Sequence, residues 1–450
     1  MPPEIARRFF GTDGIRGPVG GPLINPDFVA RVGAAAGAWV GGAGIALLGR
    51  DTRASGPEIE AATARGIAAA GLCVVSLGIL PTPAIARAVR DRRAALGVMV
   101  TASHNPASDN GVKFFRPGGT KLDDAAEREI EARIADDAGQ GATPTLAVDL
   151  SAREAYIEAL ARSLPAGALL GWRIALDVAN GATVVSSPEV LRRLGADLEL
   201  LGAAPDGINI NDGVGSEHPG ALASRVREVG ARLGIAHDGD GDRCVVCDER
   251  GVILDGDEVL TILGLHALRK GRLAGRELVI TVQSNLGVDE AIRAAGGTVF
   301  RTAVGDRYVL ERMRESGASL GGESSGHVVC ADLAMTGDGL ATALRLLEVM
   351  RETGAPLSEL RQQLRRFPQV TRNVRVIERR PISGCARLAA EIKALETELA
   401  GAGRVLVRYS GTEPKLRLLV EAREDAVARR GLDRLEAAAR SDLSLPPEVA

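Results

Sequence analysis

The sequence predicts an α/β protein of several domains, and three observations support this fold class. The chain has 450 residues, more than one ordinary domain contains. Short apolar runs alternate with helix-like stretches, a pattern typical of largely parallel sheets covered by helices. Aromatic residues make up only 3% of the chain, so the core must consist mainly of Ala, Val, Leu and Ile, which suits buried parallel strands.

The uncharged run Val32–Gly49 predicts a helix followed by a strand. We expect a small-residue helix that ends near Val40, because Gly41–Gly44 interrupts it, and a strand directly after this break. The expected strands are Ile45–Leu48, Cys73–Leu77, Val98–Thr101, Ile174–Asp177, Leu198–Leu201, Ile235–Asp238, Leu278–Val282 and Thr298–Thr302. The expected helices are Gly56–Ala70, Asp123–Ala135, Ser187–Leu194 and Asp257–Leu273.

Three polar or turn-like breaks divide the chain, at Asp136–Pro144, Asp248–Asp257 and Arg365–Asn373. The blocks before the last break have similar sizes but show no strong residue-level repeat. The last block predicts a smaller α+β domain, with a helix at Cys385–Leu399, strands around Arg404–Arg408 and Lys415–Glu421, and a charged final helix. The expected domains are residues 1–150, 151–254, 255–370 and 371–450.

Composition and charge argue against several classes of protein. The net charge of −3 and the lack of a basic stripe disfavour a nucleic-acid partner and an anionic membrane. Met1–Gly11 has no apolar stretch, so no signal peptide is expected. The uncharged run Val32–Gly49 is too rich in Gly and Ala for a membrane span. We therefore expect a cytoplasmic protein.

The five cysteines are too few and too scattered for a disulfide framework, which favours a reducing compartment. Cys244 and Cys247 form a CxxC motif, but this motif lies in an apparent strand and has no second pair. We interpret both cysteines as small buried hydrophobic residues rather than as zinc or redox ligands.

The first motif of chemical interest is Thr101-Ala-Ser-His-Asn-Pro106, directly after an apolar strand. A polar loop at the carboxyl end of a strand is where α/β sheets bind ligands. The hydroxyl of Ser103 is a weak nucleophile unless it is activated, or unless it carries a phosphoryl group that a metal ion helps to transfer. Taken alone, the motif is also consistent with an ordinary turn.

The second motif, Asp238-Gly-Asp-Gly-Asp-Arg243, is a cluster of carboxylates after another apolar strand. The glycines let the backbone curl so that all three aspartates face one cation, and oxygen ligands suit Mg²⁺ or Ca²⁺. A calcium EF-hand is the rival interpretation, since Glu249 falls at its twelfth position. We reject it because Arg243 stands where an EF-hand needs glycine and because the flanks look like strands.

The third motif is Gly321-Gly-Glu-Ser-Ser-Gly-His327, whose Glu and Ser side chains can bind the hydroxyls or amine of a sugar. It also matches the GxSxG pattern of serine hydrolases, with Ser324 as nucleophile. That pattern requires a helix just after the serine, and the sequence predicts a strand there. The hydrolase interpretation therefore ranks low.

The fourth motif is Arg408-Tyr-Ser-Gly-Thr-Glu-Pro-Lys-Leu-Arg417. Hydroxyls, free backbone N–H groups at a glycine turn and two arginines can together bind a phosphate. A hairpin with a solvated basic turn is the alternative.

Together and in this order, the four motifs resemble those of the α-D-phosphohexomutase superfamily over essentially the whole chain, and within it the bacterial phosphoglucosamine branch. Further matching segments are Phe10-Gly-Thr-Asp-Gly-Ile-Arg-Gly17, Gly111-Val-Lys-Phe-Phe115, Asp206-Gly-Ile-Asn-Ile-Asn211 and Val304-Gly-Asp-Arg-Tyr-Val309. The resemblance implies three similar α/β domains with mixed, mostly parallel sheets and a smaller C-terminal α+β domain around a central active-site cleft. In chain order these would be the phosphoserine, metal-binding, sugar-binding and phosphate-binding domains.

The resemblance implies an isomerase that reversibly converts glucosamine 6-phosphate to glucosamine 1-phosphate, which feeds UDP-N-acetylglucosamine and cell-wall synthesis. Phosphorylated Ser103 would donate its phosphoryl group, and a 1,6-bisphosphate would form, turn over and return the other phosphate. One Mg²⁺ per chain would be bound by Asp238, Asp240, Asp242 and an oxygen of the Ser103 phosphate. The partner would be a small hexosamine phosphate, and both a monomer and a homodimer stay open.

The matching motifs also imply the remaining site residues. Catalytic roles would fall to Ser103, His104, Lys113, Arg16 and His327, with Lys113 and His327 as candidates for proton transfer or charge stabilisation. The implied substrate-binding residues are Arg243, Glu323, Ser325, Arg408, Ser410, Gly411, Thr412 and Arg417. Glu323 and Ser325 would hold the sugar hydroxyls. The C-terminal loop would clamp the phosphate that does not react, and its domain would close to exclude water.

Two positions depart from the family pattern. Ala303 stands where a lysine is usual, which removes a cation near the expected sugar phosphate, and Arg301 is a candidate replacement. Ser324 stands where the phosphoglucosamine branch usually has Gln or Asn. A phosphoglucomutase or phosphomannomutase of the same superfamily therefore stays open as an alternative, as does a sugar-phosphate-binding protein with reduced turnover.

Overall fold

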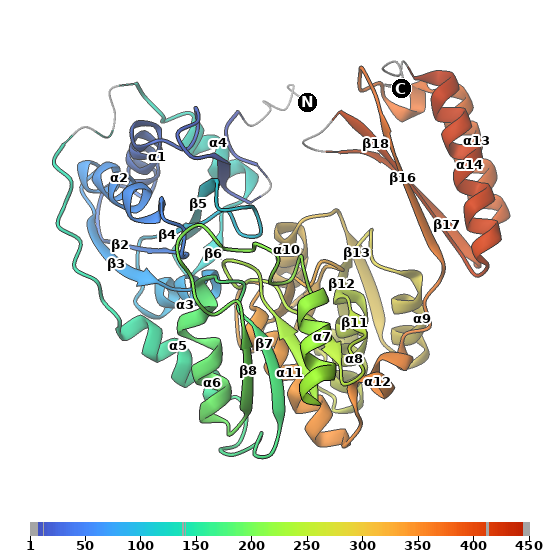
Figure 1. The fold of residues 1–450 in the computed structure, drawn as a ribbon. Helices are drawn as coiled ribbons and strands as arrows, with labels where there is room; N and C mark the ends of the chain where they lie inside the picture. The colour runs from blue at the N-terminus through green and yellow to red at the C-terminus, as the bar shows by residue number, and fades with distance from the viewer. Residues whose placement is uncertain (1–7, 12, 137–138, 140, 411–413, 444–450) are drawn as a thin grey trace. The chain divides into compact units, whose positions relative to one another are not determined.

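The computed structural model describes residues 8–11, 13–136, 139, 141–410 and 414–443 (Figure 1). The chain divides into two compact units. The first unit comprises Met1–Thr281 and Gly296–Gln363, and the second comprises Val282–Ala295 and Leu364–Ala450. The described residues of the first unit form three sheets, and those of the second form one.

The first sheet has the strand order β1-β5-β4-β2-β3, and β6 pairs with β5. Its strands are β1 (Ile15–Pro18), β2 (Ile45–Arg50), β3 (Cys73–Ile79), β4 (Leu96–Val100), β5 (Asp109–Arg116) and β6 (Thr120–Lys121). The helices of this block are α1 (Pro26–Trp39), α2 (Gly56–Ala69), α3 (Thr82–Asp91) and α4 (Asp124–Glu131). β2 is parallel to β3 and β4, whereas β5 is antiparallel to β4 and β1.

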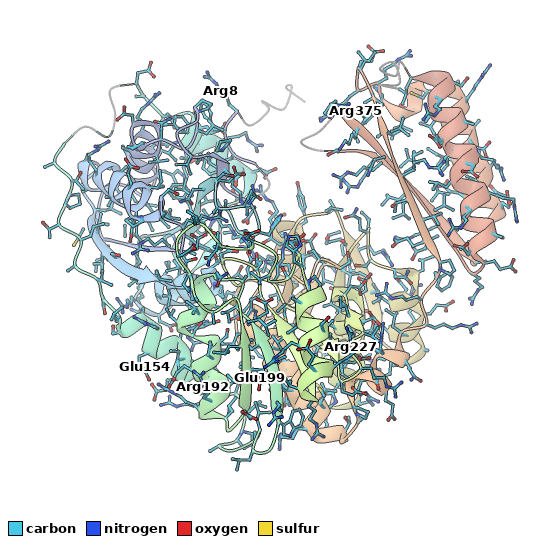
Figure 2. All side chains as sticks on the ribbon, in the orientation of Figure 1. Arg8, Glu154, Arg192, Glu199, Arg227 and Arg375 are labelled. Atoms are coloured by element: carbon cyan, nitrogen blue, oxygen red, sulfur yellow. The ribbon has the colours of Figure 1, made fainter. Side chains whose placement is uncertain are left out.

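The second sheet has the order β11-β10-β9-β7-β8, with β7 parallel to β8 and β9 and the other pairs antiparallel. Its strands are β7 (Arg173–Asp177), β8 (Asp197–Leu201), β9 (Leu233–Ala236), β10 (Val245–Asp248) and β11 (Ile253–Leu254). The helices of this block are α5 (Ser151–Ala161), α6 (Ser187–Arg193) and α7 (Gly220–Val229). Their outer faces carry charged side chains such as Glu154 on α5 and Arg192 on α6 (Figure 2).

The third sheet has the order β13-β12-β14-β15, with β12 parallel to β13 and β14, and β15 antiparallel to β14. Its strands are β12 (Glu277–Thr281), β13 (Thr298–Thr302), β14 (Leu320–Gly322) and β15 (Val328–Cys330). The first-unit helices of this block are α8 (Gly256–Arg269), α10 (Asp306–Ser316), α11 (Gly339–Thr353) and α12 (Leu357–Leu360).

These three sheets repeat one topology that the sequence does not show as a residue-level repeat. In each, a central strand (β2, β7 or β12) lies between two parallel neighbours. The later neighbour (β4, β9 or β14) then leads into an antiparallel strand (β5, β10 or β15). The connecting turn therefore lies at the same place in all three sheets, and the mixed α/β fold is confirmed.

The uncharged helix near the start of the chain is explained by close packing. α1 ends at Trp39, as expected, and packs against α2 through glycines. A Cβ atom added to Gly66 would lie 1.8 Å from the carbonyl oxygen of Ala30. Small residues are therefore needed here for packing. Within the described ranges, no helix combines the length and the hydropathy that crossing a membrane would require.

The second unit holds an antiparallel sheet of order β16-β18-β17. Its elements are α9 (Leu286–Ala294), β16 (Gln369–Arg375), α13 (Ala386–Glu398), β17 (Gly403–Tyr409), β18 (Lys415–Ala422) and α14 (Asp425–Asp442). Leu416, Leu418 and Val420 of β18 join the core formed with α13 and α14. Since side chains alternate along a strand, Arg417 lies on the opposite face of the sheet. The smaller α+β domain is confirmed.

The element boundaries differ from the prediction at a few places. Asp248–Asp257 is not a plain linker, because Ile253–Leu254 forms β11 and α8 begins at Gly256. Leu254 is fully buried, and Asp255 caps α8 in a capping box with Glu258, so both serve regular structure. The helix expected over Asp123–Ala135 ends at Glu131.

A buried tyrosine–carboxyl contact joins α5 to the start of α11. The Tyr156 hydroxyl lies 3.0 Å from both carboxyl oxygens of Asp338, which also accepts the Ala341 N–H as N-cap of α11. Burial raises the pKa of Asp338 to about 6, although these hydrogen bonds oppose the shift. Because this folded-state pKa exceeds the unfolded value, the carboxyl adds stability at low pH, and that stability is lost as pH rises through about 6.

We predict that Asp338→Asn, which resembles the protonated side chain at every pH, changes the pH dependence of stability. Between pH 7.5 and pH 5 the wild type should gain about 1 kcal/mol of unfolding free energy relative to this variant, because only the wild type takes up the proton. Denaturant unfolding followed by circular dichroism at both pH values measures the difference.

Asp123→Asn is the matched control, since Asp123 is the N-cap of α4. Partial burial raises the pKa of Asp123, but hydrogen bonds from the Ala126 N–H and from Arg116 outweigh this and lower it. The stability that the Asp123 carboxylate contributes is therefore lost only in more acidic solution. The difference in unfolding free energy between Asp123→Asn and the wild type should stay constant from pH 7.5 to 5. If the difference in unfolding free energy between Asp338→Asn and the wild type were also the same at both pH values, the prediction would be contradicted.

Candidate active site

Three of the predicted motifs lie on the equivalent turns of the three similar sheets. Ser103 lies between β4 and β5, Asp240 between β9 and β10, and Glu323 between β14 and β15. The second and third turns contact each other through an isolated antiparallel bridge between Arg243 and His327. The repeated topology thus brings residues that are distant in sequence into one site of the first unit.

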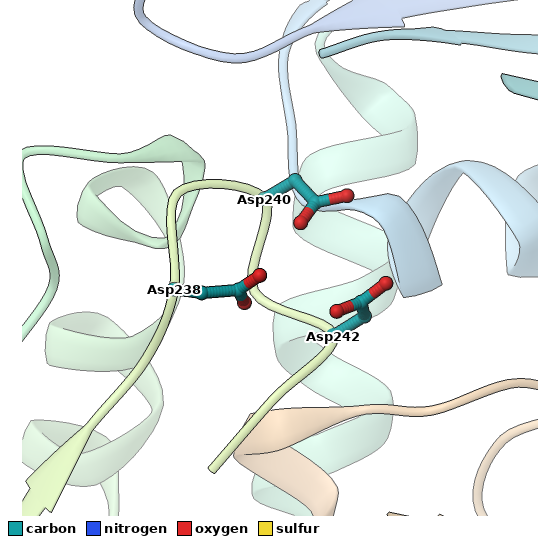
Figure 3. A group of neighbouring side chains, drawn as sticks. All are labelled: Asp238, Asp240 and Asp242. Atoms are coloured by element: carbon teal, nitrogen blue, oxygen red, sulfur yellow. The ribbon is translucent and has the colours of Figure 1, made fainter. Parts of the chain in front are cut away.

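Asp238, Asp240 and Asp242 form a buried cluster in which the potential ligand oxygens lie within 4.8 Å of one another (Figure 3). The strands β9 and β10 flank the loop, which confirms the rejection of the EF-hand. Burial and the two neighbouring carboxylates raise the pKa of Asp238 well above its usual range. Three carboxylates this close need cations to be stable in the ionised form.

The residues of this cluster fit a divalent cation. Oδ1 of Asp240 is buried and has no hydrogen-bond partner, whereas Oδ2 accepts from Thr82 Oγ1 at 2.5 Å. The connected carboxylates are Asp13, Asp238, Asp240, Asp242 and Asp306, and the cations paired with them are Lys113, Lys121 and Arg16. When all are ionised, these five carboxylates face three cations, and Arg243, which also lies near the aspartates, is paired with Glu217. Two negative charges are therefore left for a hard divalent ion to balance.

Ser103 lies directly against this cluster. Its Oγ donates to Oδ2 of Asp238 at 2.6 Å and lies 3.2 Å from Nδ1 of His104. Its backbone has a φ of +52°, a left-handed conformation that is uncommon for a residue with a side chain. The Ser103 N–H donates to Thr101 Oγ1 at 2.8 Å, which helps to hold this conformation.

Lys113 reaches the cluster from β5. Its Nζ lies 2.7 Å from carboxylate oxygens of both Asp240 and Asp13 and 3.3 Å from Asp242. Burial alone would lower the pKa of Lys113, but the three carboxylates raise it well above its usual range. Arg16 on β1 pairs with Asp13 at 2.5 Å, so Asp13 links both cations to the site.

His327 faces the same cluster from the third sheet. Its Nε2 lies 3.2 Å from a carboxylate oxygen of Asp306 and 3.9 Å from one of Asp242. Asp306 also binds Lys121, whose Nζ lies 2.8 Å from Asp13. Charged side chains from all three blocks of the first unit therefore meet at this site.

Sequence reasoning did not assign Asp13, Lys121, Asp306 or Thr82 to the site. Asp13 and Asp306 lie inside segments that matched the superfamily, so a signal was present. Lys121 and Thr82 belong to no such motif, and only the fold brings them close to the carboxylates.

His104 and Arg243 lie at the edge of this cluster. Burial, with a smaller contribution from Arg243, lowers the pKa of His104 to about 4. Arg243 Nη1 donates to Oε1 of Glu217 at 2.9 Å, and Glu217 is half exposed. Arg243 is thereby oriented by a residue that the sequence motifs did not include.

In the predicted sugar loop, Glu323 is partly buried and Ser325 is exposed. Oε1 of Glu323 accepts the Gly305 N–H at 2.9 Å, and burial raises the pKa of Glu323. Ser325 is exposed at the turn. β15, not a helix, follows this turn, so the structure lacks the strand–turn–helix arrangement that a serine hydrolase needs around Ser324.

The fourth motif lies in the second unit, on the hairpin of β17 and β18. Arg408 and Arg417 are directly opposite each other, and Arg417 Nη2 lies 3.4 Å from Oγ of buried Ser410. Burial and the charge of Arg417 lower the pKa of Arg408. Like charges opposite each other destabilise a sheet, so this pair is suited to an anion. Gly411 and Thr412, also predicted here, lie outside the described residues.

Comparison with protein families supports the superfamily resemblance. The phosphoglucomutase/phosphomannomutase α/β/α domains I, II and III match residues 7–140, 154–251 and 255–367, and the C-terminal domain of that family matches residues 372–438. These matches cover nearly the whole chain and follow the family's domain order.

Individual relatives agree with the family match. The chain is 45% identical to a phosphoglucosamine mutase of Aeromonas hydrophila subsp. hydrophila, over 94% of this chain and 97% of that protein. It is 46% identical to one of Thermobifida fusca, over 97% and 99%. A crystal structure of a phosphoglucomutase/phosphomannomutase family protein from Burkholderia thailandensis has a TM-score of 0.82 and 27% identity, and covers 97% of this chain and 98% of its own.

We predict that Asp238→Asn abolishes stabilisation by divalent cations. The thermal unfolding midpoint of the wild type should rise with MgCl₂ or MnCl₂, by the equivalent of about 2.7 kcal/mol at 100 times the Kd. The variant should not respond. In EDTA it should unfold no earlier than the wild type, because burial and the two neighbouring carboxylates already disfavour the charged form of Asp238. Differential scanning fluorimetry measures both effects.

The matched control is Asp248→Asn, a buried carboxylate on β10 outside the cluster. This variant should respond to the cation as the wild type does. An equal response of Asp238→Asn and the wild type would rule out the cluster as the cation site.

Proposed function

The chain belongs to the phosphoglucomutase/phosphomannomutase family, and we propose that it is an isomerase that reversibly converts glucosamine 6-phosphate to glucosamine 1-phosphate. The reaction type rests on one observation, the 2.6 Å contact between Ser103 Oγ and the aspartate cluster. A hydroxyl held beside a cation site can take up and return a phosphoryl group. The choice of sugar is supported by 45% and 46% identity to phosphoglucosamine mutases.

In the first half-reaction, the P–O bond to Ser103 breaks and the phosphoryl group moves to the C1 hydroxyl of glucosamine 6-phosphate. His327 is the candidate that takes the proton this hydroxyl loses, and Lys113 is the candidate that gives a proton to the Ser103 oxygen as that oxygen leaves. The ammonium of Lys113, shared among three carboxylates, and Arg16 stabilise the charge that develops. His104, beside Ser103 Oγ, is a further candidate for orienting that oxygen.

Asp238, Asp240, Asp242 and an oxygen of phosphorylated Ser103 would hold one Mg²⁺, which when bound neutralises charge on the phosphoryl group. In the second half-reaction the 1,6-bisphosphate has reoriented, and the P–O bond at C6 breaks as this phosphoryl group returns to Ser103. Ser103 Oγ gives its proton back to Lys113, the C6 oxygen takes one from His327, and C1 keeps the other phosphate. Glucosamine 1-phosphate is then released for UDP-N-acetylglucosamine and cell-wall synthesis.

Recognition of the rest of the substrate is assigned to the other loops. Glu323 and Ser325 hold the sugar hydroxyls, and Arg243 contributes from the aspartate loop. The phosphate that does not react is bound by the fourth motif, namely Arg408, Ser410, Gly411, Thr412 and Arg417. Residues 1–150, 151–254, 255–370 and 371–450 then form the phosphoserine, metal-binding, sugar-binding and phosphate-binding domains. We further propose that the enzyme works in the cytoplasm.

A second candidate activity, on glucose or mannose phosphates, is favoured by Ala303 and Ser324. Arg301 is a weak replacement for the usual lysine, because its Nη1 donates to the Thr281 carbonyl oxygen at 3.1 Å. Lys121 instead brings a cation to Asp306. Comparing kcat/KM for the 1-phosphates of glucosamine, glucose and mannose tests the choice, and a higher value for either hexose would replace the proposed substrate.

We predict that Ser103→Ala loses all mutase activity and cannot be phosphorylated at this position. Intact and peptide mass spectrometry of the wild type should show phosphate on Ser103, and this phosphate should leave when glucosamine 6-phosphate is added. Ser108→Ala is the control, because Ser108 is exposed on the same loop. A wild type that turns over substrate without phosphate on Ser103 would refute the proposal.

We also predict that Arg417→Gln raises KM about 10-fold or more, the value of one charge-assisted hydrogen bond to phosphate. Its thermal stability should change little, because the lost contact with Ser410 is offset by relief of the repulsion with Arg408. Steady-state kinetics and thermal unfolding measure these effects. The control is Arg372→Gln, whose arginine on β16 pairs with Asp433 and Glu436 of α14. Equal KM values in the two variants would argue against the phosphate site.

A further inference from the structure

The loop that carries Ser103 is organised around one buried arginine side chain. Arg53 follows β2, and its side chain is 0% exposed. Its Nη2 donates to the carbonyl oxygens of Ser103 at 3.0 Å and Asn105 at 2.8 Å, and its Nη1 donates to those of Asp109, at 2.8 Å, and Pro106. One guanidinium therefore fixes carbonyl groups from the start to the end of this loop.

The same arginine is connected to the N–H side of Ser103. Asp51 accepts from Nε of Arg53 at 2.9 Å and from Thr101 Oγ1 at 2.6 Å. Thr101 Oγ1 in turn accepts the Ser103 N–H at 2.8 Å. Both the N–H and the carbonyl group of Ser103 are thus held by a closed set of buried hydrogen bonds that starts at Arg53.

A second donor comes from the block of the second sheet. Nδ2 of Asn211 donates to the carbonyl oxygens of Ser103 at 2.9 Å and Asn105 at 3.1 Å, the same two that accept from Arg53 Nη2. Asn211 is buried, and its own N–H donates to the Ala179 carbonyl oxygen at 2.9 Å. The loop of Ser103 is therefore fixed against the block that carries the aspartates.

This fixation matters because of the conformation it maintains. Ser103 has a φ of +52°, which costs free energy and persists only where surrounding contacts impose it. Its Oγ must stay at the aspartates in both half-reactions, and phosphoryl transfer depends mainly on positioning and electrostatic stabilisation. Lysine could not replace Arg53, because an ammonium lacks the planar fork of donors.

We propose that Arg53 and Asn211 are positioning residues that hold Ser103 Oγ against Asp238 during both phosphoryl transfers. The proposal rests on the proposed role of Ser103 as phosphoryl carrier. It assigns to these two residues an effect on the rate of transfer rather than on the binding of the sugar phosphate.

The test compares Arg53→Lys and Asn211→Ala with the matched control Arg50→Lys. Arg50 lies on β2, and its Nε pairs with buried Glu60 at 3.1 Å. We expect kcat for glucosamine 1-phosphate to fall about 100-fold in Arg53→Lys and about 10-fold in Asn211→Ala, because the reacting oxygen would be displaced. The KM of both variants should stay within about 3-fold of the wild-type value. Arg50→Lys should stay within about 2-fold in kcat. Mn²⁺ affinity, measured by electron paramagnetic resonance, should change less than 3-fold in all three.

A kcat of Arg53→Lys and Asn211→Ala equal to that of Arg50→Lys would overturn the proposal, and so would a loss that appears only in KM. If Arg53→Lys does not fold, the kcat and KM of Asn211→Ala decide alone. Phosphorylation and turnover of the wild type distinguish a failure of this inference from a failure of the proposed function. A wild type without phosphate on Ser103 and without turnover refutes both, whereas an active wild type with unaffected variants refutes only the positioning role.

Discussion

The burial of three aspartates on one turn is the constraint on which the rest of the site depends. Asp238, Asp240 and Asp242 have almost no exposure, so their charges cannot be screened by water. Hydrogen-bond donors and cations from other elements stabilise these carboxylates, including Thr82 at the start of α3 and Lys113 on β5. Ser103 donates to the same cluster, so the position of the nucleophile is set by the electrostatics that make the cluster possible.

The repeated topology of the first unit explains how such distant residues meet. Each of the three sheets ends its parallel part at a turn into an antiparallel strand, and each such turn carries one motif. Backbone contacts then join the turns, such as the bridge between Arg243 and His327. The strands are short and apolar and supply rigidity, whereas the turns carry the polar side chains.

Much of this arrangement could be predicted from the sequence, and the missing parts have a physical reason. The strand Thr298–Thr302 and the aspartate loop follow from local patterns of apolar residues, glycines and carboxylates. The capping role of Asp255 was not predicted, because it lies in a charged, turn-like stretch that we interpreted as a linker. Lys121 and Arg53 act through partners far away in sequence, so no local pattern identifies them. The repeat of the sheets was also hidden, because topology depends on apolar patterning and not on residue identity.

The placement of one motif on each sheet has a consequence for how such an enzyme can diversify. The loop between β14 and β15 is held by its own hairpin, and it is joined to the aspartate turn at its end, through Gly326 and His327. A substitution inside this turn, such as the one represented by Ser324, would leave the turns of Ser103 and of the aspartates in place. Because His327 at the end of the same turn faces the aspartates, such a change would have to keep that end fixed while the middle of the turn varies.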